Sequence, residues 1–473
     1  MRTRTLSGLG LLTDLYQLTM GAAYLKRGIA DSRAVFELFV RHLPPVRSYM
    51  VFAGLEPVLQ YFDRLAFTPA EVQYLRRHEM FQHVGPEFFE RLRHLRFSGD
   101  VWAMPEGTVA FAGEPLLRVE APLFEAQLVE TFLLSMINFQ TSVATKAARI
   151  VQAAAGRGVV EFGTRRAHTP YAGLYGARAA YVGGCIGTSN LEAGYEYGIP
   201  VLGTFSHSYT LAFEDEAAAF RNFWDVFRQR TTLLIDTYDT LRGAGRAAGI
   251  GLPVHAVRLD SGDFLQLSRR VRALLDRRGR PEIQIMASGD LNEYRIEDLT
   301  RLGAPIDSYG VGTELITSQD APALGGIYKL VEIERRGRAA WPAKFSPRKA
   351  TVPGRKQVYR FFRPPRPAAG RAAAARPVAE STAAGQMLYD WVELQDAPPP
   401  RGGHPLLVPV LRGGRRAPAG ERAADLRAAR ERCLRQLEQL PARYRRLVEA
   451  ARYPVRLSPA LQRLLRQARQ QLK

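Results

Sequence analysis

The sequence predicts an α/β protein: an irregular parallel α/β barrel plus a discontinuous β-rich α+β domain. Between residues 155 and 315, short apolar runs end in small and polar residues and then give way to helical patterns, at least six times. Such alternation is typical of a parallel sheet covered by helices. So many units in one stretch favour a closed or nearly closed barrel over an open sheet. Short alternating runs broken by turn residues lie on both sides of this region, and they predict antiparallel strands.

The expected domain order follows from these changes of pattern. Residues 363–385 are rich in Pro, Ala and Arg without periodicity, which is typical of a flexible surface insertion. The expected segments are an N-terminal α+β segment of the β-rich domain (1–122), the barrel (123–324), a return segment that completes the β-rich domain (325–420), and basic amphipathic helices (421–473).

Composition narrows the class of protein. The chain has 473 residues, 46% of them hydrophobic, which allows two or three globular domains. Its two cysteines, Cys185 and Cys433, are too few for a disulfide framework or a cysteine-based zinc site, and they fit a reducing cytosol. Apolar stretches such as 132–139 are far shorter than the ~20 residues that span a bilayer. We therefore expect a cytoplasmic protein without membrane contact.

Positive charge is concentrated at the C-terminal end. The formal net charge is +20, and residues 401–473 hold 18 Lys and Arg against 5 Asp and Glu, which is +13 of that total. A surface for nucleic acid or an acidic membrane is one interpretation. The other, which we favour, is a pair of amphipathic helices with arginines on the solvated side, since apolar stripes run through 426–440 and 461–472. Ser458 and Pro459 suit the N-cap and first position of the second helix.

Each apolar run of the barrel region ends in a cluster of glycine, hydroxyl and charged residues. In a parallel barrel the loops after the strands build the active site, so we expect these clusters to face one pocket. The clusters are EFGTRRAH (161–168), GGCIGTSN (183–190), LGTFSHS (202–208), VRLDSGD (257–263), MASGD (286–290) and YGVGTEL (309–315).

Two of these clusters combine charge with other binding groups. In VRLDSGD, Arg258, Asp260 and Asp263 surround a Ser-Gly turn. Carboxylates this close can hold ribose hydroxyls or magnesium, and arginine offers a planar fork to a carboxylate or phosphate, but a turn with a surface ion pair is an equal alternative. In EFGTRRAH, Phe162 and Arg165 could hold a flat anionic ring by stacking and charge. A core phenylalanine beside solvated arginines is the alternative there.

MASGD and YGVGTEL place glycines and hydroxyls where a strand should meet a helix. Backbone amides at such a point, unhindered by side chains, can cradle a phosphate. Glycine-rich turns also arise for steric reasons alone, so two of them on successive strands carry more weight than either one.

His207 stands just past an apolar run, among Thr204, Ser206 and Ser208. It has no cysteine or carboxylate at a spacing that would make a metal site. A buried, hydrogen-bonded core histidine is one interpretation. A nucleophile is the other, because free imidazole is largely neutral at cellular pH and the neighbouring hydroxyls could donate to a phosphoryl group.

Taken in order, LLTDLYQLTM (11–20), EFGTRRAH, GTSN, GTFSHS, RLDSGD, GVGT and KQVYR (356–360) resemble nicotinate phosphoribosyltransferase, with a family-like tail at 453–459. The resemblance implies a type II phosphoribosyltransferase fold. It implies an enzyme of the ATP-dependent ligase/glycosyltransferase class that joins nicotinate to phosphoribosyl pyrophosphate, giving nicotinate mononucleotide and pyrophosphate in NAD biosynthesis. Mg²⁺, ATP as a co-substrate hydrolysed through a phosphohistidine, and a homodimer with the active site at the subunit interface are implied as well.

The same resemblance implies a role for each site residue. Phe162 and Tyr16 would sandwich the pyridine ring, with Tyr16 reaching in from a second copy of the chain. His207 would be the phosphohistidine, and His207, Arg258 and Asp260 would be catalytic. The remaining implied roles are Arg165, Thr204 and Arg258 for nicotinate, Asp260 for the ribose hydroxyls, Ser288, Gly289, Gly312 and Thr313 for the 5′-phosphate, and Lys344 and Lys349 for the diphosphate.

Three rival functions differ in substrate or in class. In nicotinamide phosphoribosyltransferase the counterpart of Ser189 is an aspartate that accepts from the amide, so a serine here favours an acid substrate. Quinolinate phosphoribosyltransferase would need extra cations for a second carboxylate and has no phosphohistidine. A nucleic-acid-binding role for the basic C-terminal region is the third, and it would show as salt-dependent retention on DNA.

Overall fold

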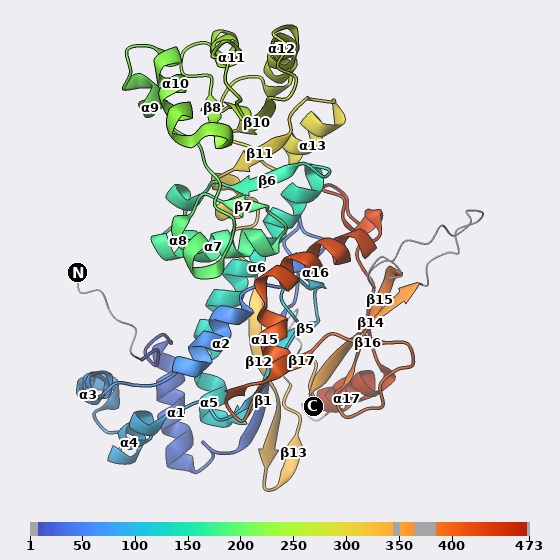
Figure 1. The fold of residues 1–473 in the computed structure, drawn as a ribbon. Coiled ribbons are helices and arrows are strands. Elements are labelled where there is room, and N and C mark those ends of the chain that lie inside the picture. The colour runs from blue at the N-terminus through green and yellow to red at the C-terminus, as the bar shows by residue number, and fades with distance from the viewer. Residues whose placement is uncertain (1–7, 344–350, 364–384, 471–473) are drawn as a thin grey trace. The chain divides into compact units, whose positions relative to one another are not determined.

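A computed structural model describes residues 8–343, 351–363 and 385–470. The chain forms two compact units. Unit 1 combines Met1–Thr141 with Ala323–Lys473, and unit 2 is the single stretch Ser142–Pro322 (Figure 1).

Unit 2 is built on a six-stranded parallel sheet in the order β7-β6-β11-β10-β9-β8. Figure 1 labels all of these strands except β9. Helices follow the strands and pack on them, for example α11 on β9 and α12 on β10. The strands are β6 (Gly158–Glu161), β7 (Gly187–Thr188), β8 (Thr232–Leu234), β9 (Ala256–Leu259), β10 (Gln284–Ser288) and β11 (Ser308–Val311). The helices are α7 (Pro170–Val182), α8 (Leu191–Tyr197), α9 (His207–Leu211), α10 (Glu216–Phe227), α11 (Thr240–Gly249), α12 (Phe264–Arg277), α13 (Glu293–Arg301) and α14 (Thr313–Ile316).

The predicted α/β class is confirmed, but the barrel is incomplete. Strands β7 and β8 are the two edges of the sheet as the described residues form it. They have two and three residues, so they offer few backbone groups with which to close a ring. An isolated bridge between Thr188 and Val201 extends the β7 edge. The nearly closed barrel of the prediction is therefore a half-barrel.

The long helical pattern after residue 122 forms two helices, α5 (Leu123–Leu128) and α6 (Glu130–Ala153). The division between the units falls inside α6, after residue 141, whereas the sequence indicated 122; the second division follows 322 rather than 324. Phe124 of α5 and Ile137 of α6 belong to the hydrophobic core of unit 1. A continuous helical period does not reveal which core each turn joins, so the sequence placed the first boundary too early.

Unit 1 contains a seven-stranded sheet in the order β13-β12-β1-β5-β3-β17-β18 and a four-stranded sheet in the order β16-β14-β15-β19. Three strands from the N-terminal part of the chain form the centre of the larger sheet, and strands from the C-terminal part flank them on both sides. Strand β1 pairs with β5 and β12, and β3 pairs with β5 and β17, all antiparallel. Its strands are β1 (Arg33–Val40), β3 (Asp100–Ala103), β5 (Pro115–Pro122), β12 (Gly326–Arg335), β13 (Arg338–Ala340), β17 (Val408–Arg412) and β18 (Arg415–Arg416). The smaller sheet holds β14 (Lys356–Arg363), β15 (Gln386–Leu394), β16 (His404–Pro405) and β19 (Val455–Leu457), and β2 (Met50–Val51) pairs with β4 (Val109–Ala110). The helices are α1 (Leu15–Arg27), α2 (Leu55–Arg64), α3 (Pro69–Arg77), α4 (Pro86–His94), α15 (Pro418–Ala424), α16 (Leu426–Gln439) and α17 (Pro459–Gln470).

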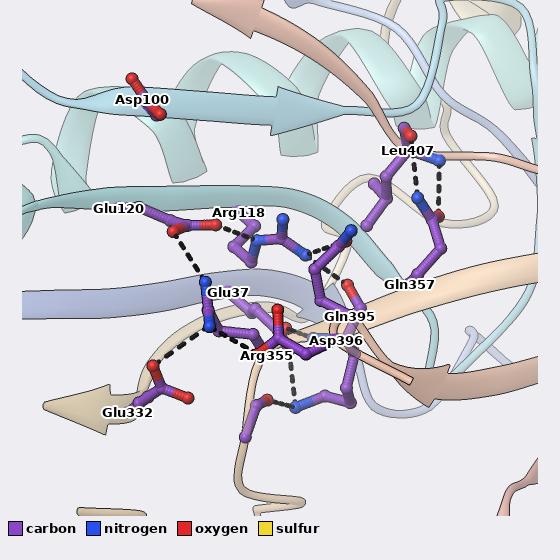
Figure 2. Close-up of polar contacts among 12 residues, drawn as sticks. Glu37, Asp100, Arg118, Glu120, Glu332, Arg355, Gln357, Gln395, Asp396 and Leu407 are labelled. Carbon is purple, nitrogen blue, oxygen red and sulfur yellow. Dashed lines mark hydrogen bonds and ion pairs between the residues drawn. The ribbon is translucent and has the colours of Figure 1, made fainter. Parts of the chain in front are cut away.

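Buried polar side chains link these two sheets (Figure 2). Lys356 begins β14, and its Nζ lies 2.8 Å from Glu37 of β1, with both side chains buried. Arg118 of β5 donates to the carbonyl of Lys356 at 2.6 Å. Gln357 bonds both the N–H and the C=O of Leu407, each at 3.0 Å (Figure 2). In this structure the KQVYR motif therefore joins one sheet to the other.

The C-terminal region forms helices where the apolar stripes predict them. Helix α16 buries Ala429, Cys433 and Leu437 among its arginines. Ser458 Oγ accepts from the N–H of Leu461 at 3.1 Å, which confirms the predicted N-cap ahead of α17. The basic residues thus lie on amphipathic helices that pack through their apolar sides, as in the interpretation favoured from the sequence.

Other expectations concern cysteines, membranes and the insertion. Both cysteines are buried, and neither forms a disulfide bond. In the part of the chain that the structure describes, no helix has the length and apolar character to cross a membrane. Residues 364–384 of the expected insertion, together with Lys344 and Lys349, lie outside the described residues.

Candidate active site

The polar clusters at the carboxyl ends of the unit 2 strands face two adjoining cavities. One, which we call the His207 cavity, has a volume of about 400 Å³, and the other, the Gly289 cavity, has about 480 Å³. Strands β6, β11, β10 and β9 are neighbours, so the loops that follow them meet at one edge. Both cavities are lined by Phe162, Arg165, Arg258 and Asp260; the His207 cavity adds Ser189, Thr204, Ser206 and His207, and the Gly289 cavity adds Arg166, Ser288, Gly289, Gly312 and Thr313.

Arg258, Asp260 and Ser288 form a bonded set where the two cavities meet. Arg258 donates to Asp260 Oδ1 at 2.6 Å and to Ser288 Oγ at 2.7 Å. Parallel pairing places Met286 of β10 opposite Arg258 of β9, which brings Ser288 beside Asp260. Burial alone would raise the pKa of the Asp260 carboxyl, but the Arg258 charge and the bonds from Ser288 and Arg258 outweigh burial and hold that pKa below its ordinary value. Asp260 is therefore an anion throughout the physiological pH range.

His207 begins α9 and reaches toward this set. Its Nδ1 lies 3.2 Å from Thr237 Oγ1 and its Nε2 lies 3.8 Å from Asp260 Oδ2. With 42% of its side chain exposed, it is not the buried core histidine of the alternative interpretation. Thr204 also lines the His207 cavity, but its hydroxyl donates to the carbonyl of Thr232 at 2.9 Å. The Thr204 proton is thus already used within the protein.

Phe162 presents its ring to both cavities. The Arg258 guanidinium carbon lies 5.7 Å from the ring centroid, within cation–π range. A Cβ built on Gly310 would lie 2.5 Å from the Phe162 ring, so only glycine at that position of β11 leaves room for it. Arg165 and Arg166 follow in the short 3₁₀ turn Thr164–Arg166. The aromatic face and the cations predicted from EFGTRRAH therefore lie side by side.

Gly289 shapes the other cavity. Its φ is +95°, and a Cβ there would lie 2.0 Å from the carbonyl oxygen of Asp260. Glycine is required on both counts, because the left-handed conformation and the close approach each exclude a larger side chain. The expected helix behind the second turn, α14, has only four residues, so its dipole contributes little to anion binding. Gly289 and its neighbours offer hydroxyls and open backbone instead.

Asp236 was missed by sequence reasoning. It follows β8, and its Oδ2 accepts from the N–H of Asp260 at 2.9 Å and from Ser261 Oγ at 2.8 Å. Its Oδ1 is buried and makes no hydrogen bond with any residue that the structure describes. The sequence pattern that could have revealed Asp236 is the one used for the other clusters: a short, mostly apolar run, here TLLI (232–235), is followed directly by a polar residue. The strand that this run forms, β8, has only three residues, and the run was not recognised as a strand.

Comparison with known proteins matches nearly the whole chain to one family. The nicotinate phosphoribosyltransferase (NAPRTase) N-terminal domain matches residues 11–138, its C-terminal domain matches 383–465, and the quinolinate phosphoribosyl transferase C-terminal domain matches 143–321. The nicotinate phosphoribosyltransferase pncB2 of Mycobacterium tuberculosis is 44% identical over 455 residues, 95% of this chain and 91% of that protein. The chain belongs to the nicotinate phosphoribosyltransferase family.

Further relatives agree with this membership. The nicotinate phosphoribosyltransferase of Bacillus subtilis is 46% identical over 363 residues, 75% of this chain and 73% of that protein. The crystal structure of human nicotinic acid phosphoribosyltransferase matches with a TM-score of 0.77 at 28% identity, covering 97% of this chain and 100% of that one. Nicotinate-nucleotide pyrophosphorylase from Pyrococcus furiosus matches with a TM-score of 0.70 at 26% identity, covering 93% and 97%. The resemblance inferred from the motifs and the type II phosphoribosyltransferase fold are confirmed.

Among the described residues, Tyr16 is the predicted nicotinate phosphoribosyltransferase site residue that lies in unit 1. It is the second residue of α1 and is 46% exposed. Partial burial and the nearby Glu130 carboxylate raise the pKa of its phenol to about 12. The side chain is thus an uncharged, accessible aromatic ring, and its place over the pyridine ring stays a prediction.

Proposed function

We propose that this chain joins nicotinate to phosphoribosyl pyrophosphate, releasing pyrophosphate and forming nicotinate mononucleotide for NAD biosynthesis, with ATP hydrolysis coupled through a phosphohistidine at His207. One observation carries the proposal beyond family membership. Two cavities of different character share a wall made of Phe162, Arg258 and Asp260. Such an arrangement can hold a flat acid and a sugar phosphate in contact with each other.

The His207 cavity is suited to the pyridine ring. Phe162 offers an aromatic face, and Arg165 and Arg258 offer cations for the nicotinate carboxylate. Ser189 lines the same cavity and adds no negative charge that would repel an acid. This supports nicotinate over nicotinamide. Quinolinate carries a second carboxylate, whereas one of the two arginines in this cavity, Arg258, is already paired with Asp260. This supports nicotinate over quinolinate, despite the match of the half-barrel to the quinolinate enzyme's domain.

The Gly289 cavity is suited to the sugar phosphate. Ser288, Gly289, Gly312 and Thr313 would hold the 5′-phosphate, and Asp260 would hold ribose hydroxyls. The ring nitrogen of nicotinate is itself a nucleophile, so the displacement at ribose C1 needs no strong base. The protein's contribution is to fix nitrogen and carbon in line, and ideal positioning is worth roughly 7–11 kcal/mol. Arg258 lies in both cavities and can position both substrates.

Asp236 and Asp260 fit a role in holding magnesium. Among the described residues, no group of three or more His, Cys, Asp or Glu side chains could hold a metal ion. Mg²⁺ commonly takes only one or two carboxylates and completes its shell with water and substrate phosphates. The unpartnered, buried Asp236 Oδ1 is a ligand atom of the right kind. When bound, Mg²⁺ would neutralise the charge that develops on the leaving diphosphate.

His207 is placed to accept a phosphoryl group from ATP. Its ring is half-exposed in the cavity, and Thr237 fixes the Nδ1 side at 3.2 Å. The hydroxyls of Ser206 and Ser208, 2.7 Å apart, are exposed nearby and can turn to donate to a phosphoryl group. A phosphoryl group here would stand beside the phosphoribosyl site, which supports coupling between ATP hydrolysis and synthesis.

We infer a cytoplasmic homodimer as the working form. Leu191 and Tyr195 lie one turn apart on α8 and are 77% and 91% exposed. Apolar side chains this exposed beside an active-site loop are typical of a covered surface. The two buried cysteines form no disulfide bond, which fits a reducing compartment.

The decisive experiment mixes protein, nicotinate, phosphoribosyl pyrophosphate and Mg²⁺, with and without ATP, and follows nucleotide formation. Nicotinate mononucleotide should form in both cases and accumulate further with ATP. Nicotinamide and quinolinate, offered in parallel, should give little product. Preferred use of either one would overturn the substrate assignment.

A further inference from the structure

A fully buried lysine, Lys146, contacts the wall of the Gly289 cavity. It lies on the part of α6 that belongs to unit 2, and none of its side chain is exposed. Its Nζ lies 2.6 Å from Glu293, 2.9 Å from Asp320 and 3.2 Å from Glu314. Arg149, one helical turn further on, contacts the other oxygen of Glu293 at 3.0 Å. Three carboxylates thus converge on one ammonium group.

All three carboxylates belong to segments that form the Gly289 cavity. Glu314 is part of the cavity wall. Glu293 begins α13, two residues after Leu291 of the wall, and Asp320 directly follows Gln319 of the wall. Lys146 therefore ties the loop after β10 to the loop after β11. These are the two loops between which a sugar phosphate would sit.

The charge of Glu314 makes this tie important for an anionic ligand. Glu314 follows Thr313, which the proposed function assigns to the 5′-phosphate. A carboxylate in the wall repels a phosphate across a few ångströms, and the repulsion is strong in a site sheltered from water. An ammonium group in contact with the carboxylate offsets that repulsion and also fixes where the carboxylate lies.

We propose that Lys146 is a positioning residue for the phosphoribosyl pyrophosphate site: it touches no substrate, but holds the two phosphate loops together and offsets part of the negative charge of Glu314. This inference rests on the proposed function. It predicts that loss of the lysine weakens the binding of phosphoribosyl pyrophosphate far more than the binding of nicotinate. The reason is that the proposed nicotinate contacts come from Phe162, Arg165 and Arg258.

The first test is Lys146→Met, which keeps the length of the side chain and removes its charge. The KM for phosphoribosyl pyrophosphate should rise roughly 10-fold or more, since small misplacements in a site can cost up to ~100-fold. The KM for nicotinate at saturating phosphoribosyl pyrophosphate should stay within about 3-fold. Calorimetric titration with phosphoribosyl pyrophosphate alone should show the same weakening. Lys146→Arg should recover part of the affinity.

Two further variants separate positioning from general stability. Lys356→Met removes a buried lysine of unit 1 that pairs with Glu37 at 2.8 Å, and it should lower thermal stability without a selective change in either KM. Adding Glu314→Gln to Lys146→Met removes the unpaired wall charge, so it should restore a large part of the lost affinity for phosphoribosyl pyrophosphate.

If Lys146→Met does not fold, Asp320→Asn serves instead, because it loosens one of the three contacts and leaves the lysine in place. It should raise the KM for phosphoribosyl pyrophosphate several-fold with little effect on nicotinate. Equal changes in both KM values, or none, in the folded variants would overturn the inference. A wild-type protein that neither binds nor uses phosphoribosyl pyrophosphate would instead overturn the proposed function itself.

Discussion

Units 1 and 2 each place an arginine against an aspartate, and the two pairs differ in what surrounds them. In unit 1, Arg360 grips both oxygens of Asp390 at 2.9 and 2.6 Å, with neither side chain exposed. In unit 2, Arg258 contacts one oxygen of Asp260, the side chains are 14% and 26% exposed, and the other oxygen faces His207.

This difference separates a charge pair that is saturated inside the protein from one that can still bind a ligand. Arg360 also donates to the carbonyl of Val109 and to Gln436, so it makes four hydrogen bonds with its five N–H groups inside the protein. Arg258 and Asp260, in contrast, keep part of their hydrogen-bonding capacity directed at a cavity. The same residue types can therefore stabilise a fold or bind a ligand, and the number of bonding groups left over decides which.

Replacing Arg258 with alanine should produce the largest functional loss. The variant removes the cation that both cavities share, so kcat/KM for nucleotide synthesis should fall by about 1,000-fold, which corresponds to ~4 kcal/mol of transition-state stabilisation. Its melting temperature should change little because the side chain is partly exposed. Steady-state kinetics on the folded variant check this, and unchanged kinetics would remove Arg258 from the site.

Arg360→Met should show the opposite pattern. Leaving Asp390 buried without its cation should cost about 3–5 kcal/mol of unfolding free energy. The KM values of the remaining folded protein should match those of the wild type. Urea unfolding measures the loss of stability. A variant as stable as the wild type would contradict the structural role of this pair.

His207→Ala should uncouple the enzyme from ATP. ATP hydrolysis and acid-labile phosphoprotein should disappear, while ATP-independent synthesis persists at a rate roughly 10- to 100-fold below the coupled rate. Radiolabelled ATP and acid quenching measure the phosphoprotein. Persistent labelling of the variant would place the phosphoryl group on another residue.

The two units also differ in the direction in which the pKa of a carboxyl group is shifted, upward for Glu114 in unit 1 and downward for Asp260 in unit 2. Burial and the neighbouring Asp390 raise the pKa of Glu114 in unit 1. The folded state therefore holds a proton that the unfolded chain releases above about pH 4.5, so this group's stabilising effect is lost as the pH rises through the raised pKa. A tenfold difference in proton affinity between the folded and unfolded states is worth roughly 1.4 kcal/mol of unfolding free energy.

The measurement is urea unfolding of the wild type and Glu114→Gln at pH 5, 6.5 and 8. The wild type should lose more stability on going to pH 8 than the variant does. Asp260 offers the matched contrast, since its pKa is lowered and it is ionised over this whole window, so Asp260→Asn should leave the slope unchanged. Parallel slopes for Glu114→Gln and the wild type would contradict the assignment.

The smallest effect is expected at the basic C-terminal helix. Changing Arg463, Arg466 and Arg469 of α17 to glutamine alters exposed side chains on a helix that packs through its apolar side. Synthesis and stability should both stay within experimental error, because surface changes away from packed features usually cost under ~0.5 kcal/mol. Salt-dependent retention of the wild type on DNA, lost in this variant, would favour the nucleic-acid role instead.

The sequence predicted most of the residues that line the two cavities, because these polar residues follow apolar strands. Phe162, Arg258, Ser288 and Gly312 each stand at or just beyond the end of such a run, and parallel strands bring those ends together. Asp236 was missed because the run that forms the three-residue β8 was not recognised, whereas the two-residue β7 was found through its GTSN motif. Where the apolar run is long enough to recognise as a strand, the site residue after it can be predicted.

Other features depend on contacts that sequence spacing does not reveal. The residues next to Lys146 in the sequence do not indicate that Glu293, Glu314 and Asp320 contact it in the folded protein. The KQVYR motif was recognised, yet its place between two sheets follows only from its partners far along the chain. The early division expected at residue 122 failed for a similar reason, since one helix serves two cores.

In the larger sheet of unit 1, strands from the beginning of the chain are flanked on both sides by strands from its end, and this sets the order in which the sheet can be completed during synthesis. Strand β3 ends at Ala103, but its partner β17 begins at Val408, and β1 waits for β12, which begins at Gly326. A ribosome therefore releases the whole half-barrel before unit 1 can close. Until then the nascent chain carries open strand edges that invite wrong pairing, so slowed translation or premature termination after residue 322 should yield aggregates rather than a shortened enzyme.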